Sequence, residues 1–588
     1  MTENIEMDFA VIDPQPAHPA WPAMTLDEAR AILCAHGAFF EMETVAVRGV
    51  PTRTWANQCP NLGALARRAR DQFAERELVV FESEHITYDG FFRAAAAVAR
   101  HLREAGVGKG DRIAIAMRNL PEWIPIFFGI TALGAIAVPL NAWWTGGELV
   151  YGLANSGSKI LICDEERWRV IAPHLGELPD LCEIWVARAN GAELHSPARA
   201  LESLIGQPTA YGALPDGDFP AVAVEPDDDA TIFYTSGTTG SPKGALGTHR
   251  NILTISLTAS YNAHRAALRR GEGTPPTDAR THLLVIPLFH ATGCHATLMN
   301  TVMAGNRLVL MRKWDPLEAM RLIERERIFS TGGVPTIAWQ LIEHPERHRF
   351  DLSSLAAVSY GGAPSAPELV QRIGGDLNAF ASNGWGMTET SGTVTLHSAE
   401  DYAQRPDSCG PPVAVADLRI MSPEGDRELP TGEVGELWAA GPQIVKGYWR
   451  NPAATAATFV NGWVRTGDLA RIDAEGFCYI VDRAKDMIIR GGENIYSTEV
   501  ENILYGHPGV IDAALVGIPH RILGEVPGAI VHLADGAAAT EADLQEWVRA
   551  RIAAFKVPVS ILFVPELLPR NANGKILKGD LKALFEPR

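Results

Sequence analysis

The strongest constraint on the fold is a repeated order of helix-length and strand-length segments from Ile86 onward. Residues 86–106 form an amphipathic helical segment that ends at a glycine, and residues 111–119 form a short apolar run that ends in polar residues. Further apolar runs of strand length, separated by helical segments, are 131–141, 159–164, 282–288, 306–311 and 356–362. Helices that alternate with strands place the strands parallel, so the pattern predicts an α/β protein with parallel sheets.

The pattern changes after about Pro411. Residues 415–425, 428–441 and 477–492 are short apolar runs interrupted by glycines, which is typical of an antiparallel β section. The final hundred or so residues are enough for a small domain of their own, with both helices and strands. A chain of 588 residues is too long for one hydrophobic core, so we expect several domain-sized units.

Charge and cysteine usage limit the partners and the compartment. The formal net charge is −18, and so acidic a surface repels nucleic acid and anionic lipid. Seven widely spaced cysteines without a CxxC pair favour a reducing compartment over a disulfide framework or a zinc site. The acidic N-terminus, interrupted by prolines, lacks the features of a secretory signal, so we expect a cytoplasmic protein.

One apolar stretch, residues 124–140, raises the question of a membrane span. It is short for a span, and Pro125 and Pro139 interrupt it. We therefore predict a buried helix that runs into a buried strand, and no integral membrane segment.

The sequence YTSGTTGSPKG, residues 234–244, is rich in glycine and hydroxyl side chains and carries one lysine. Backbone N–H groups of small residues can converge on an anion, so a polyphosphate fits such a loop. The loop is not the P-loop of ordinary ATPases. In that motif the lysine follows a glycine and is followed by serine or threonine, whereas here Lys243 follows a proline and is followed by Gly244. A glycine-serine surface turn is the alternative. The apolar run directly before the loop favours a ligand site at a strand end.

Seven motifs together resemble those of the adenylate-forming enzymes, the superfamily of acyl-CoA synthetases, adenylation domains and beetle luciferases. They occur in the family order and cover the chain from about Ile86 to the C-terminus. The motifs are YTSGTTGSPKG (234–244), PLFHATG (287–293), SYGGAP (359–364), NGWGMTE (383–389), RTGDLA (465–470), DRAKDMIIRGGENI (482–495) and PRNANGKI (569–576).

The resemblance implies a domain division and a two-step reaction. An extension of unknown role (1–50) would precede a large domain that binds ATP and acid (51–481), a hinge (482–485) and a mobile C-terminal lid domain (486–588). A carboxylate would attack the α-phosphate of ATP to give acyl-AMP and pyrophosphate, and a thiol, usually CoA, would then displace AMP. Both steps depend on positioning and on neutralising negative charge.

Residue roles for ATP follow from the resemblance. The glycine-rich loop would hold the β- and γ-phosphates, Thr388 would contact the α-phosphate, and Glu389 would bind Mg²⁺. Trp385, where the family often has tyrosine, would stack on adenine. Asp468 would accept hydrogen bonds from the ribose, and Arg483 would approach the same sugar. The complete expected ATP site is Thr235, Ser236, Gly237, Thr238, Thr239, Gly240, Lys243, Gly362, Ala363, Pro364, Trp385, Gly386, Met387, Thr388, Glu389, Asp468 and Arg483.

The lid supplies further expected residues. By resemblance, Lys575 enters the active site during adenylation and neutralises charge between the carboxylate and the α-phosphate. Lys485 marks the point about which the lid turns after pyrophosphate leaves. That turn would withdraw Lys575 and bring Gly491 and Gly492 to the acyl-adenylate, where glycines let the backbone approach the pantetheine arm closely.

The acid pocket is expected around His290, Val334 and Pro335. At His290 the family carries an aromatic residue or histidine, so packing is favoured there over a role as general base. Amino-acid-activating relatives commonly have aspartate at this position to pair with the substrate ammonium, which would be costly to bury unpaired. A plain carboxylic acid with a fatty or other hydrophobic body is therefore expected.

The acceptor and the assembly are less constrained. The GGENI segment and the lack of a carrier domain in the sequence favour CoA, and a separate carrier protein is the alternative acceptor. A catalytically silent nucleotide-binding protein is disfavoured, because Lys243, Glu389, Asp468, Arg483 and Lys575 are all present. No motif supports luciferase-like oxidation. Expected ligands are ATP, Mg²⁺, CoA and a small carboxylic acid, and both a monomer and a homodimer remain open.

Overall fold

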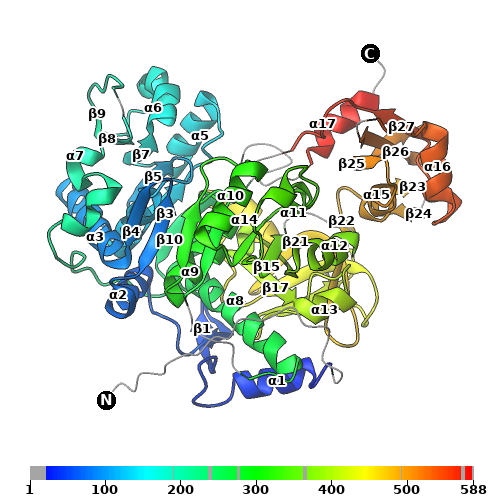
Figure 1. Cartoon of the computed structure of the whole chain (residues 1–588), viewed down its shortest axis with the longest axis horizontal. Coiled ribbons are helices and arrows are strands. Elements are labelled where there is room, and N and C mark those ends of the chain that lie inside the picture. Colours follow the sequence, from blue (N-terminus) through cyan, green and yellow to red (C-terminus); the bar gives the residue numbers. More distant parts are fainter. Residues whose placement is uncertain are drawn as a thin grey trace.

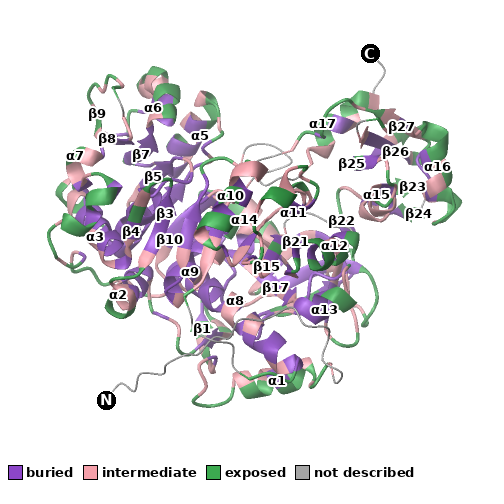
Figure 2. Ribbon diagram, viewed as in Figure 1, coloured by how far each residue is buried: buried purple, intermediate pink, exposed green. Residues whose placement is uncertain are grey.

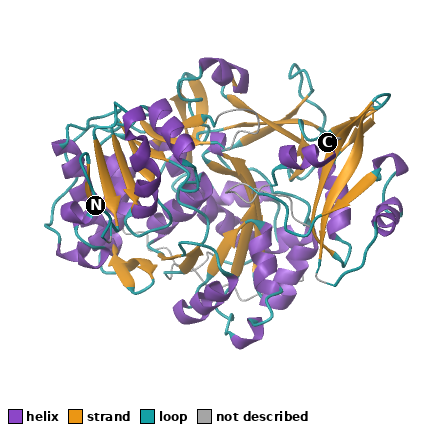
Figure 3. Cartoon of the chain, turned by 90° about the horizontal axis from the view of Figure 1, so that it is seen from above, coloured by secondary structure: helices purple, strands orange, loops and turns teal. Residues whose placement is uncertain are grey.

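The computed structural model describes residues 21–189, 191–235, 242–273, 279–361, 367–491, 493–534, 536–570 and 576–585. A large domain contains two mostly parallel sheets and an antiparallel sheet, and a smaller domain follows at the C-terminus (Figure 1). Figure 3 shows the helices beside the strands of both domains. The predicted α/β class, with a large N-terminal and a small C-terminal domain, is confirmed.

The first sheet has the strand order β11-β10-β6-β5-β7-β8-β9, and only the β11–β10 pair is antiparallel. The predicted strand runs at 111–119, 131–141 and 159–164 correspond to β5, β6 and β7. The strands are β5 (Arg112–Ala116), β6 (Ile136–Pro139), β7 (Ile160–Asp164), β8 (Glu183–Ala187), β9 (Ala198–Ala200), β10 (Asp229–Tyr234) and β11 (Gly244–Thr248).

The second sheet has the order β17-β16-β15-β14-β12-β13-β3-β4, parallel from β16 to β3 and antiparallel at both edges. The predicted runs at 282–288, 306–311 and 356–362 correspond to β12, β13 and β15. The strands are β3 (Glu77–Phe81), β4 (Glu84–Thr87), β12 (Thr281–Leu284), β13 (Arg307–Leu310), β14 (Ser330–Gly333), β15 (Ala357–Gly361), β16 (Phe380–Met387) and β17 (Gly392–Ser398).

The antiparallel section predicted after Pro411 is present as a third sheet, in which β22 also pairs with β21. Its strands are β18 (Asp417–Met421), β19 (Gly435–Ala440), β20 (Phe459–Val460), β21 (Trp463–Ile472) and β22 (Cys478–Arg483). The small domain has a sheet of its own with the order β24-β23-β26-β25, and β27 pairs with β26. Its strands are β23 (Ile488–Arg490), β24 (Glu493–Ile495), β25 (Val510–His520), β26 (Gly524–Leu533) and β27 (Ser560–Phe563).

The helices begin and end where local signals place them. In α3, Thr87 accepts a hydrogen bond from the Gly90 amide, as an N-cap residue does, and Gly106 just beyond the helix has a positive φ of 81°. In the large domain the helices are α1 (Leu26–Leu33), α2 (Leu62–Phe73), α3 (Tyr88–Glu104), α4 (Trp123–Ala132), α5 (Gly146–Ser156), α6 (Glu165–Ile171), α7 (Glu202–Ile205), α8 (His249–Arg269), α9 (Met299–Ala304), α10 (Pro316–Glu326), α11 (Pro335–Ile342), α12 (Pro367–Leu377), α13 (Ala399–Gln404) and α14 (Pro452–Thr458). In the small domain they are α15 (Ser497–Tyr505), α16 (Glu541–Arg549) and α17 (Lys578–Lys582).

The apolar stretch 124–140 is a buried helix followed by a buried strand, as predicted. Every residue of α4 and β6 is buried. None of the helices formed by the described residues is both long and apolar enough to cross a bilayer.

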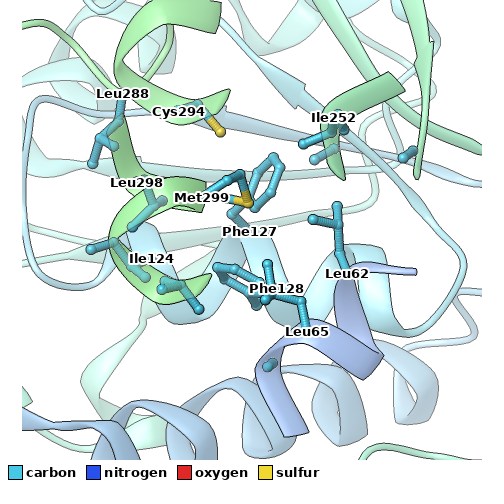
Figure 4. Packing of buried hydrophobic residues seen from close by; sticks show 14 of the residues in the cluster. Leu62, Leu65, Ile124, Phe127, Phe128, Ile252, Leu288, Cys294, Leu298 and Met299 are labelled. Atoms are coloured by element: carbon cyan, nitrogen blue, oxygen red, sulfur yellow. The ribbon is translucent and has the colours of Figure 1, made fainter. Parts of the chain in front are cut away.

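The main core lies between the sheets and the helices that cover them. Burial is concentrated on the central strands, and outer helices such as α16 carry exposed residues (Figure 2). In Figure 4, Leu62 and Leu65 of α2 pack with Phe127 and Phe128 of α4, close to Ile252 of α8. The small domain has a separate core of buried residues, among them residues of β25, β26 and α16. This separate core allows the small domain to hold its own structure.

The described residues before position 51 pack onto the large domain. Strands β1 (Met42–Val47) and β2 (Val50–Trp55) form a hairpin that pairs Met42 with Trp55, so the hairpin crosses the expected boundary at residue 50. Phe40, directly before the hairpin, is 2% exposed. At the other boundary, β22 extends to Arg483 and so contains the first two residues of the expected hinge.

Candidate active site

A cavity of about 1570 Å³ lies where β10, β15 and β16 end and the antiparallel sheet begins. Ten of the expected site residues line it: Thr235, Lys243, His290, Val334, Trp385, Gly386, Met387, Thr388, Glu389 and Arg483. Asp468 contacts two of these residues, and Pro335 follows Val334 as the first residue of α11. The structure thus brings together side chains that are far apart in the sequence.

Some expected site residues lie outside the described part of the chain. They are Ser236, Gly237, Thr238, Thr239, Gly240, Gly362, Ala363, Pro364, Gly492 and Lys575. Their roles stay predictions.

The glycine-rich loop connects two neighbouring strands at the cavity. It leaves β10 at Tyr234 and returns as β11 at Gly244, and the Thr235 amide donates to the Lys243 carbonyl at 2.8 Å. The Lys243 ammonium lies 5.1 Å from the centre of the Tyr448 ring, within the range of a cation–π contact. The loop therefore presents its single cation at the cavity wall, where a phosphate could reach it.

Glu389 lies in a single 3₁₀ turn, Thr388–Thr390, directly after β16. Its side chain is 7% exposed, and its Oε1 accepts a 2.6 Å hydrogen bond from the Tyr448 hydroxyl. Burial raises the pKa of this carboxyl, and the Tyr448 hydrogen bond opposes that shift. One buried carboxylate at the wall of a cavity that also holds Lys243 suits Mg²⁺, which takes one or two protein carboxylates and completes its shell with phosphate oxygens and water.

Asp468 connects the two residues expected on either side of the nucleoside. The Trp385 indole N–H donates to Asp468 Oδ2 at 2.8 Å, and Arg483 Nε lies 2.9 Å from Asp468 Oδ1. Asp468 is 3% exposed, and β21–β22 pairing places it directly opposite Arg483. Trp385, expected at a position where the family often has tyrosine, thus offers an aromatic face and also donates a hydrogen bond to Asp468.

Close backbone approaches explain two glycines at this end of the cavity. A Cβ on Gly386 would lie 1.8 Å from the Gly392 carbonyl oxygen, and one on Gly361 would lie 2.8 Å from the Gly384 carbonyl oxygen. Strand packing therefore requires glycine at both positions.

Another part of the cavity is lined by α8 and by the helical segment formed by Thr292–Leu298 and α9. One face of α8 lines it with Ile255, Ala259, Asn262, Ala263, Ala266 and, just beyond the helix, Arg270. At 1.5 Å per residue, Ile255 and Arg270 lie roughly 22 Å apart along the helix axis. The opposing segment contributes Thr292, Ala296, Asn300 and Ala304. Most of these side chains are small, which leaves a long channel.

His290 lies at the start of this channel. Its ring packs edge-to-face against Phe289 with centroids 4.6 Å apart, and burial lowers its pKa to about 3. A neutral imidazole with so low a pKa is a poor acceptor of a proton at neutral pH, which agrees with the packing role expected for it.

Polar groups further along the channel satisfy one another. The Asn306 amide donates to His282 Nε2 at 3.0 Å, which leaves the His282 Nδ1 proton for Ser330 Oγ at 2.6 Å. Burial lowers the His282 pKa to about 4, so this ring is neutral as well. This part of the wall therefore offers paired polar groups, whereas His290 Nε2 and Arg270 Nη1 have no hydrogen-bond partner among the described residues.

A buried ionic cluster joins the end of β22 to the small domain. Asp482 accepts hydrogen bonds from the Ser497 amide and, at 3.0 Å, from the Ser497 hydroxyl. The Lys578 ammonium donates to Ser497 Oγ at 2.6 Å and lies 2.7 Å from Glu501 Oε1. Lys485, three residues after Asp482, is exposed. The expected hinge thus begins beside a contact between the large domain and the small domain.

Gly491 occupies the turn of the β23–β24 hairpin. Its φ is +60°, and its amide donates to the Leu523 carbonyl at 2.7 Å. The left-handed conformation favours glycine, so a local structural reason for this residue exists beside its expected role toward the thiol.

Tyr448 is a site residue that the sequence motifs did not identify. The Val445 amide donates to the Glu389 carbonyl at 3.0 Å, and the Trp449 amide donates to the Gly244 carbonyl at 2.7 Å. The segment 445–449 thereby connects two parts of the site by hydrogen bonds. One part is the turn that contains Glu389, and the other is strand β11, which begins directly after Lys243. Nothing in the local sequence VKGYWRNP links Tyr448 to a carboxylate 59 residues earlier.

Comparison with known proteins agrees with this geometry. The AMP-binding enzyme family matches residues 65–449, and the AMP-binding enzyme C-terminal domain matches residues 499–575. A feruloyl-CoA synthase from Amycolatopsis sp. is 37% identical over 500 residues, which are 85% of this chain and 94% of the relative. The long-chain-fatty-acid–CoA ligase FadD13 of Mycobacterium tuberculosis is 35% identical over 503 residues, with 85% and 93% covered.

Solved structures have the same architecture. The anthranilate CoA ligase AuaEII in complex with anthranoyl-AMP superposes with a TM-score of 0.80 at 25% identity, covering 89% of this chain and 97% of that one. ATP-bound MatB from Rhodopseudomonas palustris gives a TM-score of 0.76 at 28% identity, with 89% and 99% covered.

Fold and site together define an adenylate-forming enzyme. The chain belongs to the AMP-binding enzyme family, within the superfamily of adenylate-forming acyl-CoA synthetases that its motifs resemble. The predicted enzyme class, an AMP-forming acid–thiol ligase, is confirmed at the level of this family.

Proposed function

We propose that the protein is an ATP-dependent acid–CoA ligase that activates a hydrophobic carboxylic acid as acyl-AMP and transfers the acyl group to CoA. The observation that carries the proposal is one continuous cavity with Lys243 and Glu389 at one end and the small-residue channel along α8 at the other. Such a cavity can hold a nucleotide and an acid with the carboxylate beside the phosphates, which gives the proximity that the first step needs.

In the first step, the loop 235–240 and Lys243 hold the β- and γ-phosphates, and Thr388 contacts the α-phosphate. Glu389 would hold Mg²⁺, which would supply positive charge beside the phosphates. Trp385 stacks on adenine beside the slot formed by residues 362–364. The Trp385–Asp468–Arg483 contacts support this placement, because they bring an aromatic face and a carboxylate for the ribose hydroxyls to one wall.

Charge neutralisation at the reacting centre falls to Lys575 of the lid. Its ammonium would lie between the substrate carboxylate and the α-phosphate while acyl-AMP forms. After pyrophosphate leaves, the lid turns about Lys485, and Gly491 and Gly492 come to the acyl-adenylate to admit the CoA thiol. The separate core of the small domain supports a rigid-body turn of this kind.

The acid is a fatty or aromatic acid without an ammonium group near its carboxylate. His290 stands where a pairing aspartate would be needed, and burial keeps its ring neutral. The small side chains along the channel and the pairing of His282 with Asn306 and Ser330 favour an apolar body. The names of the relatives, which include feruloyl-CoA synthase and long-chain-fatty-acid–CoA ligase, cover both aromatic and aliphatic acids.

The decisive experiment measures pyrophosphate release by the purified protein with ATP and Mg²⁺. The acids would be short, medium and long fatty acids, cinnamic and benzoic acids, sterol side-chain acids and amino acids, each with and without CoA. Release with a hydrophobic acid, followed by CoA-dependent formation of thioester and AMP, is expected. Adenylation without a thioester would point to a carrier protein, and no release with any acid would contradict the proposal.

A further inference from the structure

Helix α8 has two functional faces. The face described above lines the acid channel through Ile255, Ala259, Ala263, Ala266 and Arg270. The opposite face includes Arg250, Thr254, Tyr261 and His264, spaced by four, seven and three residues, and the described part of the N-terminal segment covers it. Figure 1 shows α1 and β1 beneath α8, although more than 200 residues lie between β1 and α8 in the sequence.

The contacts extend along the whole helix. At its beginning, the Trp55 indole donates to the Thr254 carbonyl at 3.3 Å, and the Gln58 amide donates to the Arg250 carbonyl at 3.4 Å. At its end, the Ala23 amide donates to the Arg269 carbonyl at 2.7 Å. That bond satisfies one of the carbonyl groups that a helix end leaves unpaired.

Phe40 forms the centre of this interface. Its ring makes edge-to-face contacts with Tyr261 and His264 of α8, with centroids 5.6 and 5.2 Å apart, and a third with Trp55 at 5.8 Å. Phe40 and Trp55 are each 2% exposed. Two buried aromatic side chains packed on one helix face help to hold that face in place.

The sequence of α8 makes it dependent on such support. Its middle, ILTISLTASYNAH (252–264), is rich in β-branched, serine and asparagine residues, which are weak helix formers. On its channel side the helix borders a cavity instead of packed side chains. The packing on its outer face therefore adds to the support that α8 receives from the main core, where Ile252 and Leu257 are buried.

The segment lies outside the part of the chain that the family match covers, which begins at residue 65. Hydrogen bonds also connect the N-terminal segment to residues beside the site. Arg48 Nη2 donates to the Ile444 carbonyl at 3.0 Å, and Ile444 directly precedes the segment 445–449 that holds Glu389. Arg269, which donates to the Met24 carbonyl at 2.8 Å, is also paired with Asp401 at 2.8 Å.

We propose that residues 21–58, the N-terminal brace, fix α8 as one wall of the acid channel and thereby set which acid bodies the enzyme accepts. Phe40 is the positioning residue of the brace, and it acts through Tyr261 and His264 without touching substrate. The inference rests on the proposed function, because it assigns the channel along α8 to the acid. Loosening only the Phe40 contacts widens the channel, while the Arg48–Ile444 hydrogen bond remains and the phosphate side stays in place.

The test compares Phe40→Ala with Phe92→Ala. Phe92 of α3 is also 2% exposed and packs edge-to-face on Phe219, but it does not line the cavity. Both variants are expected to lower Tm. Only Phe40→Ala is expected to raise KM for the preferred acid about fivefold, with KM for ATP within twofold, and to broaden the preference toward bulkier acids. Equal acid KM values and preferences in the two variants would overturn the proposal.

Hydrogen exchange tests the brace independently of turnover. Amides of residues 249–269 are expected to exchange faster in Phe40→Ala than in Phe92→Ala, and equal protection would overturn the inference. If the native protein activates none of the acids, the proposed function fails while the exchange comparison still decides whether the brace holds α8. Phe40→Leu and Phe92→Leu, which leave smaller cavities, serve if an alanine variant does not fold.

Discussion

The Tyr448 hydroxyl donates a 2.6 Å hydrogen bond to Glu389 Oε1, and the same ring faces the Lys243 ammonium at 5.1 Å. One side chain thus contacts both the carboxylate proposed for Mg²⁺ and the lysine proposed for the phosphates. Because Glu389 is buried, its orientation is held by this contact and not by solvent. Tyr448 therefore connects Glu389, proposed for Mg²⁺, with Lys243, proposed for the phosphates.

Removing only the hydroxyl, in Tyr448→Phe, is expected to weaken Mg²⁺ use. Burial already raises the pKa of Glu389, and the hydroxyl is the group that most opposes this shift. Its loss raises the pKa further, so a larger fraction of the carboxyl is protonated as pH falls and cannot bind metal. The acid limb of the pH–rate profile should move to higher pH, and half-maximal pyrophosphate release at pH 6 should need about tenfold more Mg²⁺.

Tyr448→Leu is the matched comparison, because it removes the ring as well as the hydroxyl. It should additionally raise KM for ATP, since Lys243 loses its aromatic contact. A Tyr448→Phe enzyme with the native Mg²⁺ requirement at every pH would exclude the positioning role.

The local sequence pattern predicted many strands of this protein. The contacts of the site that it did not predict join residues far apart in the sequence. The runs 111–119 and 159–164 are central strands because continuous apolar sequence marks a strand that is buried on both faces. The Tyr448–Glu389 and Trp385–Asp468 bonds join residues 59 and 83 positions apart, and only the packing of separate sheets creates them. The sequence assigned no role to residues 21–50, because the contacts of residues such as Phe40 with Tyr261 and His264 of α8 form only in the folded chain.

His290→Phe is expected to keep adenylation activity within about threefold while changing the preferred acid. The imidazole packs on Phe289 with a pKa lowered to about 3 by burial, so phenylalanine preserves the contact and removes no working base. Rates of acyl-AMP formation across the acid panel measure this. A loss of 100-fold or more with every acid would instead assign His290 a chemical role.

Lys575→Ala is expected to bind ATP but to lose acyl-AMP formation by roughly 10²–10³-fold, the usual cost of removing one group that stabilises developing charge. Thioester formation from chemically supplied acyl-AMP should continue near the native rate, because the lysine is withdrawn in that step. Separate assays of the two half-reactions distinguish these effects. Near-normal adenylation by the variant would contradict the role proposed for Lys575.

Acid is expected to destabilise the fold through buried histidines. Burial lowers the pKa of His249 and His295 to about 4 and that of His397 to about 3. Each stays neutral in the folded chain but takes up a proton near pH 6.5 when unfolded, so the unfolded state binds more protons between these values. The free energy of unfolding therefore falls as pH drops below about 6.5, by up to roughly 2 kcal/mol per histidine at pH 5.

His295→Gln isolates one such contribution. The Nδ1 of His295 donates to the Ser391 carbonyl at 2.8 Å and its Nε2 is buried without a hydrogen-bond partner among the described residues, so a proton there has no acceptor. Buried carboxyls with raised pKa values, such as Glu389, oppose the trend in native and variant alike. Urea unfolding at pH 7 and pH 5 should show the variant losing about 1–2 kcal/mol less than the native protein. Equal losses would mean that His295 is protonated in the folded state.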